Sequence, residues 1–177
     1  MAEHDLSRLS LDEIARLAGA QKRRPVEKWN PQRCGDSFMR IGRDGSWHHE
    51  GRPIARPALV RLFSSILRRE PDGSFVLVTP AEKLSIEVED APFVAVEVRS
   101  EGAGAERSLA FRLNTDELVL AGPDHPLWLE GERPYLNVRP GLDALIARPV
   151  YYELAEMALE EGGIWSGGAY FPLGRAT

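Results

Sequence analysis

The sequence predicts an α+β protein built from an internal duplication, whose second domain is a curled antiparallel sheet or partial barrel capped by a C-terminal helix. A strand-and-helix motif occurs twice, the second half alternates apolar and polar residues, and a few short segments have helical periodicity. We expect a small α+β domain over residues 1–70. Residues 71–177 should form the antiparallel β domain, with its helix and a tail rich in glycine and aromatic residues.

The repeated motif is a strand opening Arg-apolar-x-x-Asp, followed by an RPxLxxL helix start. The strand halves lie 72 residues apart and the helix halves 83, so the second copy holds an 11-residue insertion. Ligand sites form preferentially between domains, so the duplication predicts a site at the interface of two similar halves. The first copy comprises Arg40, Ile41, Asp44, Arg56, Pro57, Leu59 and Leu62, and the second comprises Arg112, Leu113, Asp116, Arg139, Pro140, Leu142 and Leu145.

Capping, turn and spacing signals predict the elements of the first domain. Ser10 and Glu13 form a capping box before a short apolar stripe, which indicates a first helix. Asp44-Gly45 favours a tight hairpin turn, and Pro57 suits the first position of a second helix. The expected helices cover residues 11–18 and 57–69, the hairpin strands cover 37–43 and 46–50, and residues 21–25 read as a basic linker.

The second domain is expected to hold seven strands and a final helix. The helix should begin at Pro140, and Pro149 should kink or restart it. The glycine-rich stretch GGIWSGGAYFPLG near the carboxyl end predicts irregular structure, because glycine destabilises regular elements. Three antiparallel strands are expected at residues 75–79, 84–88 and 93–98, and up to four more at 109–113, 118–121, 127–129 and 135–138.

The net charge of −5 is unevenly distributed along the chain. Residues 1–70 hold 14 Lys and Arg against 9 Asp and Glu, a net charge of +5, whereas the remainder holds 8 against 18, a net charge of −10. Two readings follow: the halves complement each other, or the arginine-rich half receives an anion. The acidic whole argues against nucleic acid as a partner.

Composition indicates a soluble, cytoplasmic protein. Charged residues make up 28% of the chain and hydrophobic residues 43%, and no apolar stretch approaches the ~20 residues of a membrane span. We expect no signal peptide and no membrane span. The one cysteine, Cys34, excludes an intramolecular disulfide and multi-cysteine zinc motifs.

No catalytic or metal-binding constellation is visible in the sequence. His48 and Glu50 share one face of their expected strand while His49 points to the other, which falls short of a zinc site. Ser166 lacks the GxSxG spacing of a nucleophile elbow, and the glycine-rich nucleotide-binding motifs are absent. We therefore assign no catalytic residue and no metal ligand.

Four stretches resemble a bacterial family known as Domain of Unknown Function 1285. They are CGDSFMRIGRDGSWHHEGRPI, RPALVRLFSSILRRE, FVLVTPAEKLSIEVEDAPFVAVEV and LNVRPGLDALIARPVYYEL. The resemblance runs from about Trp29 to the carboxyl end. It implies a duplicated fold, a second domain superficially like pleckstrin-homology domains, a nucleotide-type ligand at the domain interface and a role in signal transduction. The family often has an aromatic pair where this chain has His48-His49.

The repeat arginines are the main candidates for binding an anion. Arg56 and Arg139 each precede an expected helix start, where an arginine is unfavourable unless an anion or carboxylate lies nearby. Arg52 strengthens the first of these sites. The alternative to a ligand phosphate is an internal carboxylate such as Asp90 or Asp116.

Aromatic side chains are candidates for stacking on a ligand ring; the alternative is that they pin the two domains together by apolar contacts. Asn114 lies at an expected turn, where Asn commonly bonds its own backbone. The predicted ligand-binding residues at the domain interface are Arg40, Trp47, Arg52, Arg56, Asp90, Arg112, Asn114, Arg139, Tyr151 and Trp165.

Three functional hypotheses follow. The leading one is a ligand-binding or signalling module that holds a small anionic, nucleotide-type molecule. The second is a protein–protein interaction scaffold, with a signalling protein as partner and no small-molecule ligand. The third is a nucleotide-processing enzyme, which the absence of a visible nucleophile or metal set disfavours.

Overall fold

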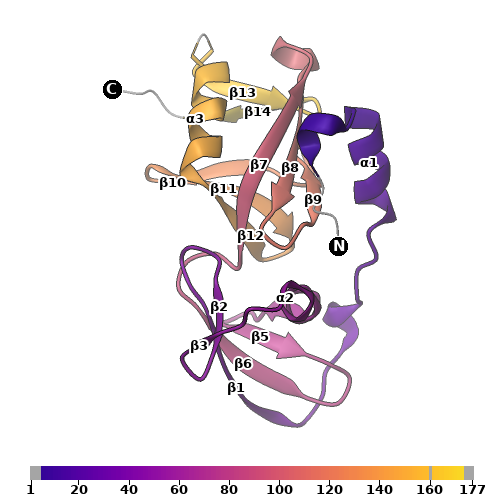
Figure 1. Ribbon diagram of the computed structural model, residues 1–177, viewed down its shortest axis with the longest axis vertical. Coiled ribbons are helices and arrows are strands. Elements are labelled where there is room, and N and C mark those ends of the chain that lie inside the picture. Colours follow the sequence, from indigo (N-terminus) through magenta and orange to yellow (C-terminus); the bar gives the residue numbers. More distant parts are fainter. Residues whose placement is uncertain (1–4, 160, 174–177) are drawn as a thin grey trace. The chain divides into compact units, whose positions relative to one another are not determined.

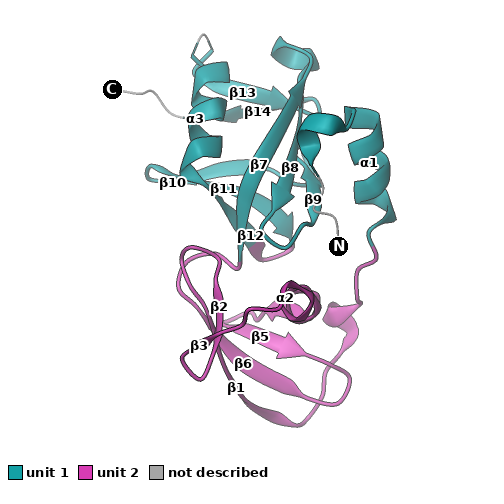
Figure 2. Cartoon of the chain, in the orientation of Figure 1, with its two compact units in different colours: residues 1–21, 93–139, 143–177 teal, residues 22–92, 140–142 magenta. Residues whose placement is uncertain are grey.

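The chain folds into two compact units of α+β structure. The computed structural model describes residues 5–159 and 161–173 (Figure 1). Unit 2 comprises residues 22–92 and 140–142, and unit 1 comprises residues 1–21, 93–139 and 143–177 (Figure 2). The α+β class predicted from the sequence is confirmed. Within the described residues, no helix has the length and apolar character needed to cross a membrane.

Unit 2 is a six-stranded sheet with one α-helix, α2. Its strand order is β3-β2-β1-β6-β5-β4, and the two central strands β1 and β6 run parallel while their outer neighbours pair antiparallel. Buried side chains of Ile41, Trp47, Leu67 and Val78 contribute to its core. The elements are η2 (Val26–Lys28), β1 (Cys34–Ile41), β2 (Trp47–His49), β3 (Arg52–Pro53), α2 (Pro57–Ser64), β4 (Leu67–Arg69), β5 (Phe75–Val78) and β6 (Lys83–Val88).

Unit 1 contains a second, curled six-stranded sheet, a hairpin and two α-helices (Figure 1). Its strand order is β10-β11-β12-β7-β8-β9, again with the two central strands parallel. The helix α3 contacts β7, which confirms the predicted sheet capped by a C-terminal helix. The elements are η1 (Leu6–Arg8), α1 (Leu11–Ala20), β7 (Phe93–Glu101), η3 (Gly104–Glu106), β8 (Ser108–Leu113), β9 (Leu118–Leu120), β10 (Leu127–Glu130), β11 (Arg133–Arg139), β12 (Leu142–Ile146), α3 (Arg148–Met157), β13 (Gly163–Ser166) and β14 (Ala169–Pro172).

The duplication is visible in the connectivity of the two sheets. Each sheet consists of two groups of three consecutive strands, and the first strand pairs in parallel with the sixth at the centre. The helices differ in position, because α2 lies between the third and fourth strands of its unit whereas α3 follows the sixth. The duplicated feature is therefore the sheet and its crossover.

The helix predicted to begin at Pro140 is a strand in the structure. Pro140-Gly141 forms the turn between β11 and β12, and Gly141 has a φ of 75°, which glycine adopts without strain. Leu142, Ala144 and Ile146 are buried in alternation, the pattern of a strand. The helix begins instead at Arg148. The tripeptide Ala55-Arg56-Pro57 at the start of α2 recurs as Ala147-Arg148-Pro149 at the start of α3, 92 positions later.

The helix predicted over residues 57–69 ends at Ser64. The hydroxyl of Ser64 donates to the Arg61 carbonyl at 2.9 Å, a side-chain bond that competes with continued helix. Leu67–Arg69 then forms the edge strand β4, which pairs antiparallel with β5. The apolar residues read at helical spacing past Ser64 therefore belong to a hairpin.

The strands at 84–88 and 93–98 belong to different sheets, although the sequence suggested a single antiparallel group. Asp90-Ala91-Pro92 ends the unit 2 sheet, and β7 pairs with β8 and β12. The domain boundary expected between residues 70 and 71 falls in the turn between β4 and β5. The structure places the division after Pro92, because β5 and β6 complete the sheet that β1 begins.

The first helix packs with the second half of the chain. Leu6 and Ile14 are buried in a cluster with Ala110 and Leu118, and α1 contacts β8 and β9. Gln21, read as part of a linker, pairs with the edge strand: its Nε2 donates to the Leu118 carbonyl at 2.9 Å and its Oε1 accepts from the Leu118 amide at 2.7 Å. The amino-terminal helix therefore belongs to unit 1.

The glycine-rich stretch near the carboxyl end forms a regular hairpin, contrary to the prediction. β13 and β14 pair antiparallel around Gly167-Gly168, both of which have positive φ. The hydroxyl of Ser166 donates to the Ala121 carbonyl at 2.7 Å and accepts from the Leu109 amide at 2.8 Å, which joins the hairpin to the rest of unit 1. Gly174, the last residue of the stretch, lies outside the described residues.

Candidate functional site

Two of the predicted arginines line a pocket of about 670 Å³ in unit 2. The pocket lies where the turn between β2 and β3 and the segment that follows it meet the first turn of α2. Arg52 and Arg56 contribute two guanidinium groups, and both side chains are exposed. The full lining is His49, Glu50, Arg52, Pro53, Ile54, Ala55, Arg56 and Leu59.

Local sequence explains why both arginines are presented here. Glu50 and Gly51 have φ values of 51° and 81°, so the chain turns within two residues. This turn places Arg52, on β3, opposite His49, on β2. The Ile54 amide then donates to the Trp47 carbonyl at 2.8 Å, which keeps the following segment beside β2. Arg56 lies at the N-cap position of α2, immediately before Pro57.

The start of α2 is electrostatically unbalanced. No side chain caps it, and its first turn carries no acidic residue. By contrast, α1 is capped by Ser10 and has Asp12 and Glu13 in its first turn. A helix amino terminus carries partial positive charge, and Arg56 adds a full one. The pocket therefore favours a negatively charged group.

The guanidinium groups of Arg52 and Arg56 have no hydrogen-bond or ion-pair partner among the residues that the structure describes. Three other predicted arginines are paired with carboxylates: Arg40 with Glu89, Arg112 with Glu97 at 2.9 Å, and Arg139 with Glu117 at 3.1 Å. These pairs match the internal-carboxylate alternative, although the acids are Glu89, Glu97 and Glu117 rather than Asp90. Asp116 lies 4.0 Å from Arg112.

The remaining predicted residues have structural contacts of their own. Trp47 is buried and stacks on Phe63 with ring centroids 6.4 Å apart. The side chain of Asn114 accepts from the Val94 amide of β7 at 3.0 Å, rather than from its own backbone as the sequence suggested. Trp165 packs against Tyr170 with ring centroids 5.4 Å apart. Tyr151, on α3, and Asp90, which follows β6, are half-buried.

The ten predicted residues divide between the two units. Unit 2 holds the two arginines that line the pocket. The predicted residues of unit 1 do not line it. The location of a ligand between the two halves stays a prediction. The unit 2 residues are Arg40, Trp47, Arg52, Arg56 and Asp90, and the unit 1 residues are Arg112, Asn114, Arg139, Tyr151 and Trp165.

Glu50 and His49 were not predicted as pocket residues, and Arg148 was not predicted to start a helix. The signal for the first two was the Glu50-Gly51 dipeptide, which marks a two-residue turn directly before Arg52. The signal for Arg148 was the repeated Ala-Arg-Pro tripeptide, which continues without glycine in both copies. A glycine after proline, as at Pro140-Gly141, instead indicates a turn.

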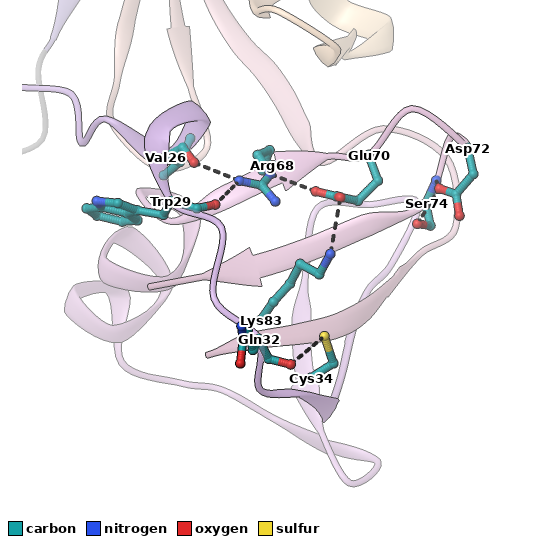
Figure 3. A network of polar contacts seen from close by, with 9 residues as sticks. All are labelled: Val26, Trp29, Gln32, Cys34, Arg68, Glu70, Asp72, Ser74 and Lys83. Atoms are coloured by element: carbon teal, nitrogen blue, oxygen red, sulfur yellow. Dashed lines mark hydrogen bonds and ion pairs between the residues drawn. The ribbon is translucent and has the colours of Figure 1, made fainter. Parts of the chain in front are cut away.

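A second arginine cluster in unit 2 holds the sheet edge together (Figure 3). Arg68 Nε donates to Glu70 at 2.6 Å, and its Nη1 donates to the carbonyls of Val26 and Trp29 at 2.8 and 2.7 Å. Lys83 reaches the other Glu70 oxygen at 3.4 Å. The hydrogen bond from Arg68 is the main cause that holds the pKa of Glu70 below its usual range. Arg68 and Glu70 each bond more than one partner within the unit, which supports a structural role for this cluster.

Within the described part of the chain, the strand β2, which carries His48 and His49, shows neither an activated nucleophile nor a metal-binding group. Ser46 Oγ donates a hydrogen bond to the Asp44 carboxylate at 2.6 Å and lies 3.0 Å from His48 Nε2. Because the hydroxyl proton is shared with Asp44, His48 is not placed as the base of a serine nucleophile. This bond lowers the pKa of Asp44. Among residues 5–159 and 161–173, no group of three or more His, Cys, Asp or Glu side chains is placed to hold a metal ion.

The fold and the pocket define a class: a two-unit α+β protein with duplicated sheets and a cationic pocket. Two family models cover the chain, "Domain of unknown function (DUF1285), N-terminal domain" over residues 24–91 and "Protein of unknown function (DUF1285), C-terminal domain" over residues 92–173. The chain belongs to the DUF1285 family. The boundary between the two matches lies within one residue of the division after Pro92.

Two solved structures are similar to this chain. A DUF1285 family protein from Silicibacter pomeroyi DSS-3 is 45% identical with a TM-score of 0.82, over 94% of this chain and 97% of that one. A DUF1285 family protein from Shewanella baltica OS155 is 27% identical with a TM-score of 0.56, over 68% of this chain and 92% of that one. No curated protein matches the chain.

Proposed function

We propose that this protein is a binding module for a small phosphate-bearing ligand, held by Arg52 and Arg56 in the unit 2 pocket. The observation that supports the proposal is that both guanidinium groups line one pocket and have no partner among the described residues. Arginine matches phosphate geometry through paired hydrogen bonds. A nucleotide-type ligand and a role in signal transduction, which the family resemblance implied, stay predictions within this proposal.

The pocket suits a small organic ligand better than a bare ion. Its volume of about 670 Å³ falls in the range of ligand sites, and Pro53, Ile54 and Leu59 add apolar surface beside the charged groups. Unit 2 also carries net positive charge, with 13 Lys and Arg against 10 Asp and Glu. That charge would raise the local concentration of an anion.

A thermal-shift screen of the full chain against nucleotides, sugar phosphates and inorganic phosphate tests this function. A ligand at ~100 times its Kd adds about 2.7 kcal/mol, which raises the Tm by several degrees. We expect at least one phosphate ester to do so, and we expect the shift to vanish in the double variant Arg52→Ala with Arg56→Ala. Arg43→Ala is the matched control, since Arg43 is an exposed arginine of the same unit outside the pocket.

The alternative is a protein–protein interaction module, which exposed apolar side chains on unit 1 favour. Tyr152 on α3 is 62% exposed, and Leu159 just beyond the helix is 75% exposed. Exposed apolar surface is one feature of protein interaction sites. This alternative predicts a protein partner whose binding is lost in Tyr152→Ser with Leu159→Ser. Binding of that partner should be unaffected in the Arg52 and Arg56 variant, which separates the two functions.

A further inference from the structure

Glu50 is the one carboxylate in the lining of the arginine pocket. Like the two arginines, its side chain has no hydrogen-bond or ion-pair partner among the described residues. A carboxylate beside two guanidinium groups normally pairs with one of them, as Glu89 does with Arg40 in the same unit. The pocket therefore offers two separate kinds of group to a ligand: donors at the arginines and an acceptor at Glu50.

The backbone holds Glu50 at this place by an unusual conformation. Its φ is 51°, at a turn position that Asn or Gly ordinarily occupies. Its amide donates to the carbonyl of Phe38 at 2.9 Å, and Phe38 itself has a φ of 57°. The turn is thus joined to β1. A non-glycine residue in this region is unfavourable, and such positions concentrate at functional sites.

The carboxylate changes which anions the pocket accepts. It repels a bare phosphate, because the two negative charges would share a small space. It accepts hydrogen bonds from hydroxyl groups, and bonds to a charged acceptor are stronger than neutral ones. A ligand that carries phosphate at one end and hydroxyl groups at the other satisfies both parts of the pocket.

We propose that the pocket selects phosphate esters of sugars or other polyols, with the phosphate on Arg52 and Arg56 and hydroxyl groups on Glu50. This inference rests on the proposed function, since it specifies the ligand class of the same pocket. A pocket of about 670 Å³ holds such a molecule, whereas inorganic phosphate alone leaves most of the volume to water.

Calorimetric titration of the full chain with three probes tests the inference: ribose 5-phosphate, n-pentyl phosphate and inorganic phosphate. Ribose 5-phosphate and n-pentyl phosphate carry the same charged group, and only the first has hydroxyl groups. We expect the wild-type protein to bind ribose 5-phosphate about tenfold or more tightly than either other probe, the fold-change of a hydrogen bond to a charged group.

Glu50→Gly is the informative variant, because glycine suits a φ of 51° and the turn should form at least as well. We expect it to lose the preference for ribose 5-phosphate and to bind inorganic phosphate at least as tightly as the wild type. Glu87→Gly, a substitution at an exposed carboxylate on β6 outside the pocket, controls for the loss of charge. We expect it to retain the wild-type order of affinities.

The outcomes separate the two proposals. If none of the three probes binds, this inference is overturned, and the proposed function is overturned as well if no ligand of the thermal-shift screen binds. If the probes bind through Arg52 and Arg56 with equal affinity, and Glu50→Gly changes nothing, the ligand class is wrong while anion binding stands. A preference for ribose 5-phosphate that disappears in Glu50→Gly supports the inference.

Discussion

Arg68 connects the edge strand β4 to the segment that precedes β1. Its guanidinium group bonds Glu70 and two backbone carbonyls, and its side chain is only 16% exposed. Removing one partner of a largely buried pair leaves the other charge unsatisfied. The contribution of this residue should therefore exceed that of an exposed ion pair.

We predict that Arg68→Met lowers the free energy of unfolding by about 3 kcal/mol, the cost of breaking a buried pair. Urea denaturation followed by circular dichroism measures this change. Arg33→Met is the control, because Arg33 is 82% exposed and lies 3.9 Å from Glu82. An exposed pair of this kind contributes about 0–1 kcal/mol. Equal effects of the two substitutions on the free energy of unfolding would contradict the structural role assigned to Arg68.

Glu70 should make stability depend on pH. The hydrogen bond from Arg68 lowers the pKa of Glu70 in the folded protein, so its stabilisation is present above the unfolded value of about 4.3. That stabilisation is lost as the pH falls through the folded value. We predict that the unfolding free energy of the wild type falls more steeply on acidification below pH ~4.3 than that of Glu70→Gln. Parallel curves would show that Glu70 contributes nothing to acid sensitivity.

Among the secondary-structure elements, helix starts and turns were predicted correctly where a particular residue type determines the local backbone conformation. Ser10 caps the first helix, with the Glu13 amide donating to its hydroxyl at 3.2 Å, and the Asp44-Gly45 hairpin pairs Ile41 with Trp47. Pairing between distant segments was not predictable. The parallel pairs β1 with β6 and β7 with β12 join strands that are far apart in the chain, and period-two alternation carries no information on partner or direction.

The helix predicted to begin at Pro140 was wrong because the RPxLxxL motif was taken as a helix start although glycine follows its proline. RPxLxxL matches both Arg56-Pro57 and Arg139-Pro140, but only the second is followed by glycine. The physical difference was visible in the sequence, because Pro-Gly suits a tight turn and Pro-Ala suits a helix start. Of the predicted arginines, Arg52 and Arg56 line one pocket, whereas Arg139 ends β11 and pairs with Glu117; binding of an anion at the pocket stays a prediction.

Two glycines should respond oppositely to alanine. Gly19 lies in α1 with no atom within 4 Å of a built Cβ, so Gly19→Ala should raise the free energy of unfolding by about 0.5–1 kcal/mol. At Gly163 on β13, a Cβ would lie 2.6 Å from the Phe171 carbonyl oxygen, so Gly163→Ala should be destabilising. Chemical denaturation of both variants measures the effects. Equal responses would contradict the described packing of β13 and β14.

At the scale of the whole molecule, chain order and unit membership differ. The helix α1 precedes unit 2 in the sequence but packs on β8 and β9 of unit 1, with Ile14 fully buried. Charge follows the units as well, with a net charge of +3 on residues 22–92 and 140–142 and −8 on the remainder. A boundary read from sequence order and charge alone could not find a helix that returns to the other unit.

We predict that Ile14→Ala destabilises unit 1 by about 2–5 kcal/mol, the range for truncating a buried isoleucine. Native-state hydrogen exchange should show faster exchange in β8 and β9, while protection in β5 and β6 is unchanged. Gln21→Ala should act in the same direction, because Gln21 bonds both backbone groups of Leu118. Loss of protection confined to unit 2 would contradict the packing of α1.

The location at which a phosphate ester binds decides whether Arg52 and Arg56 form an anion site. Amide chemical-shift mapping of the isotopically labelled full chain during titration with ribose 5-phosphate measures this location. We predict that shifts concentrate at residues 49–59, around Arg52 and Arg56, and that they disappear in the double alanine variant. Saturable binding with shifts centred elsewhere, or shifts that persist in that variant, would contradict it.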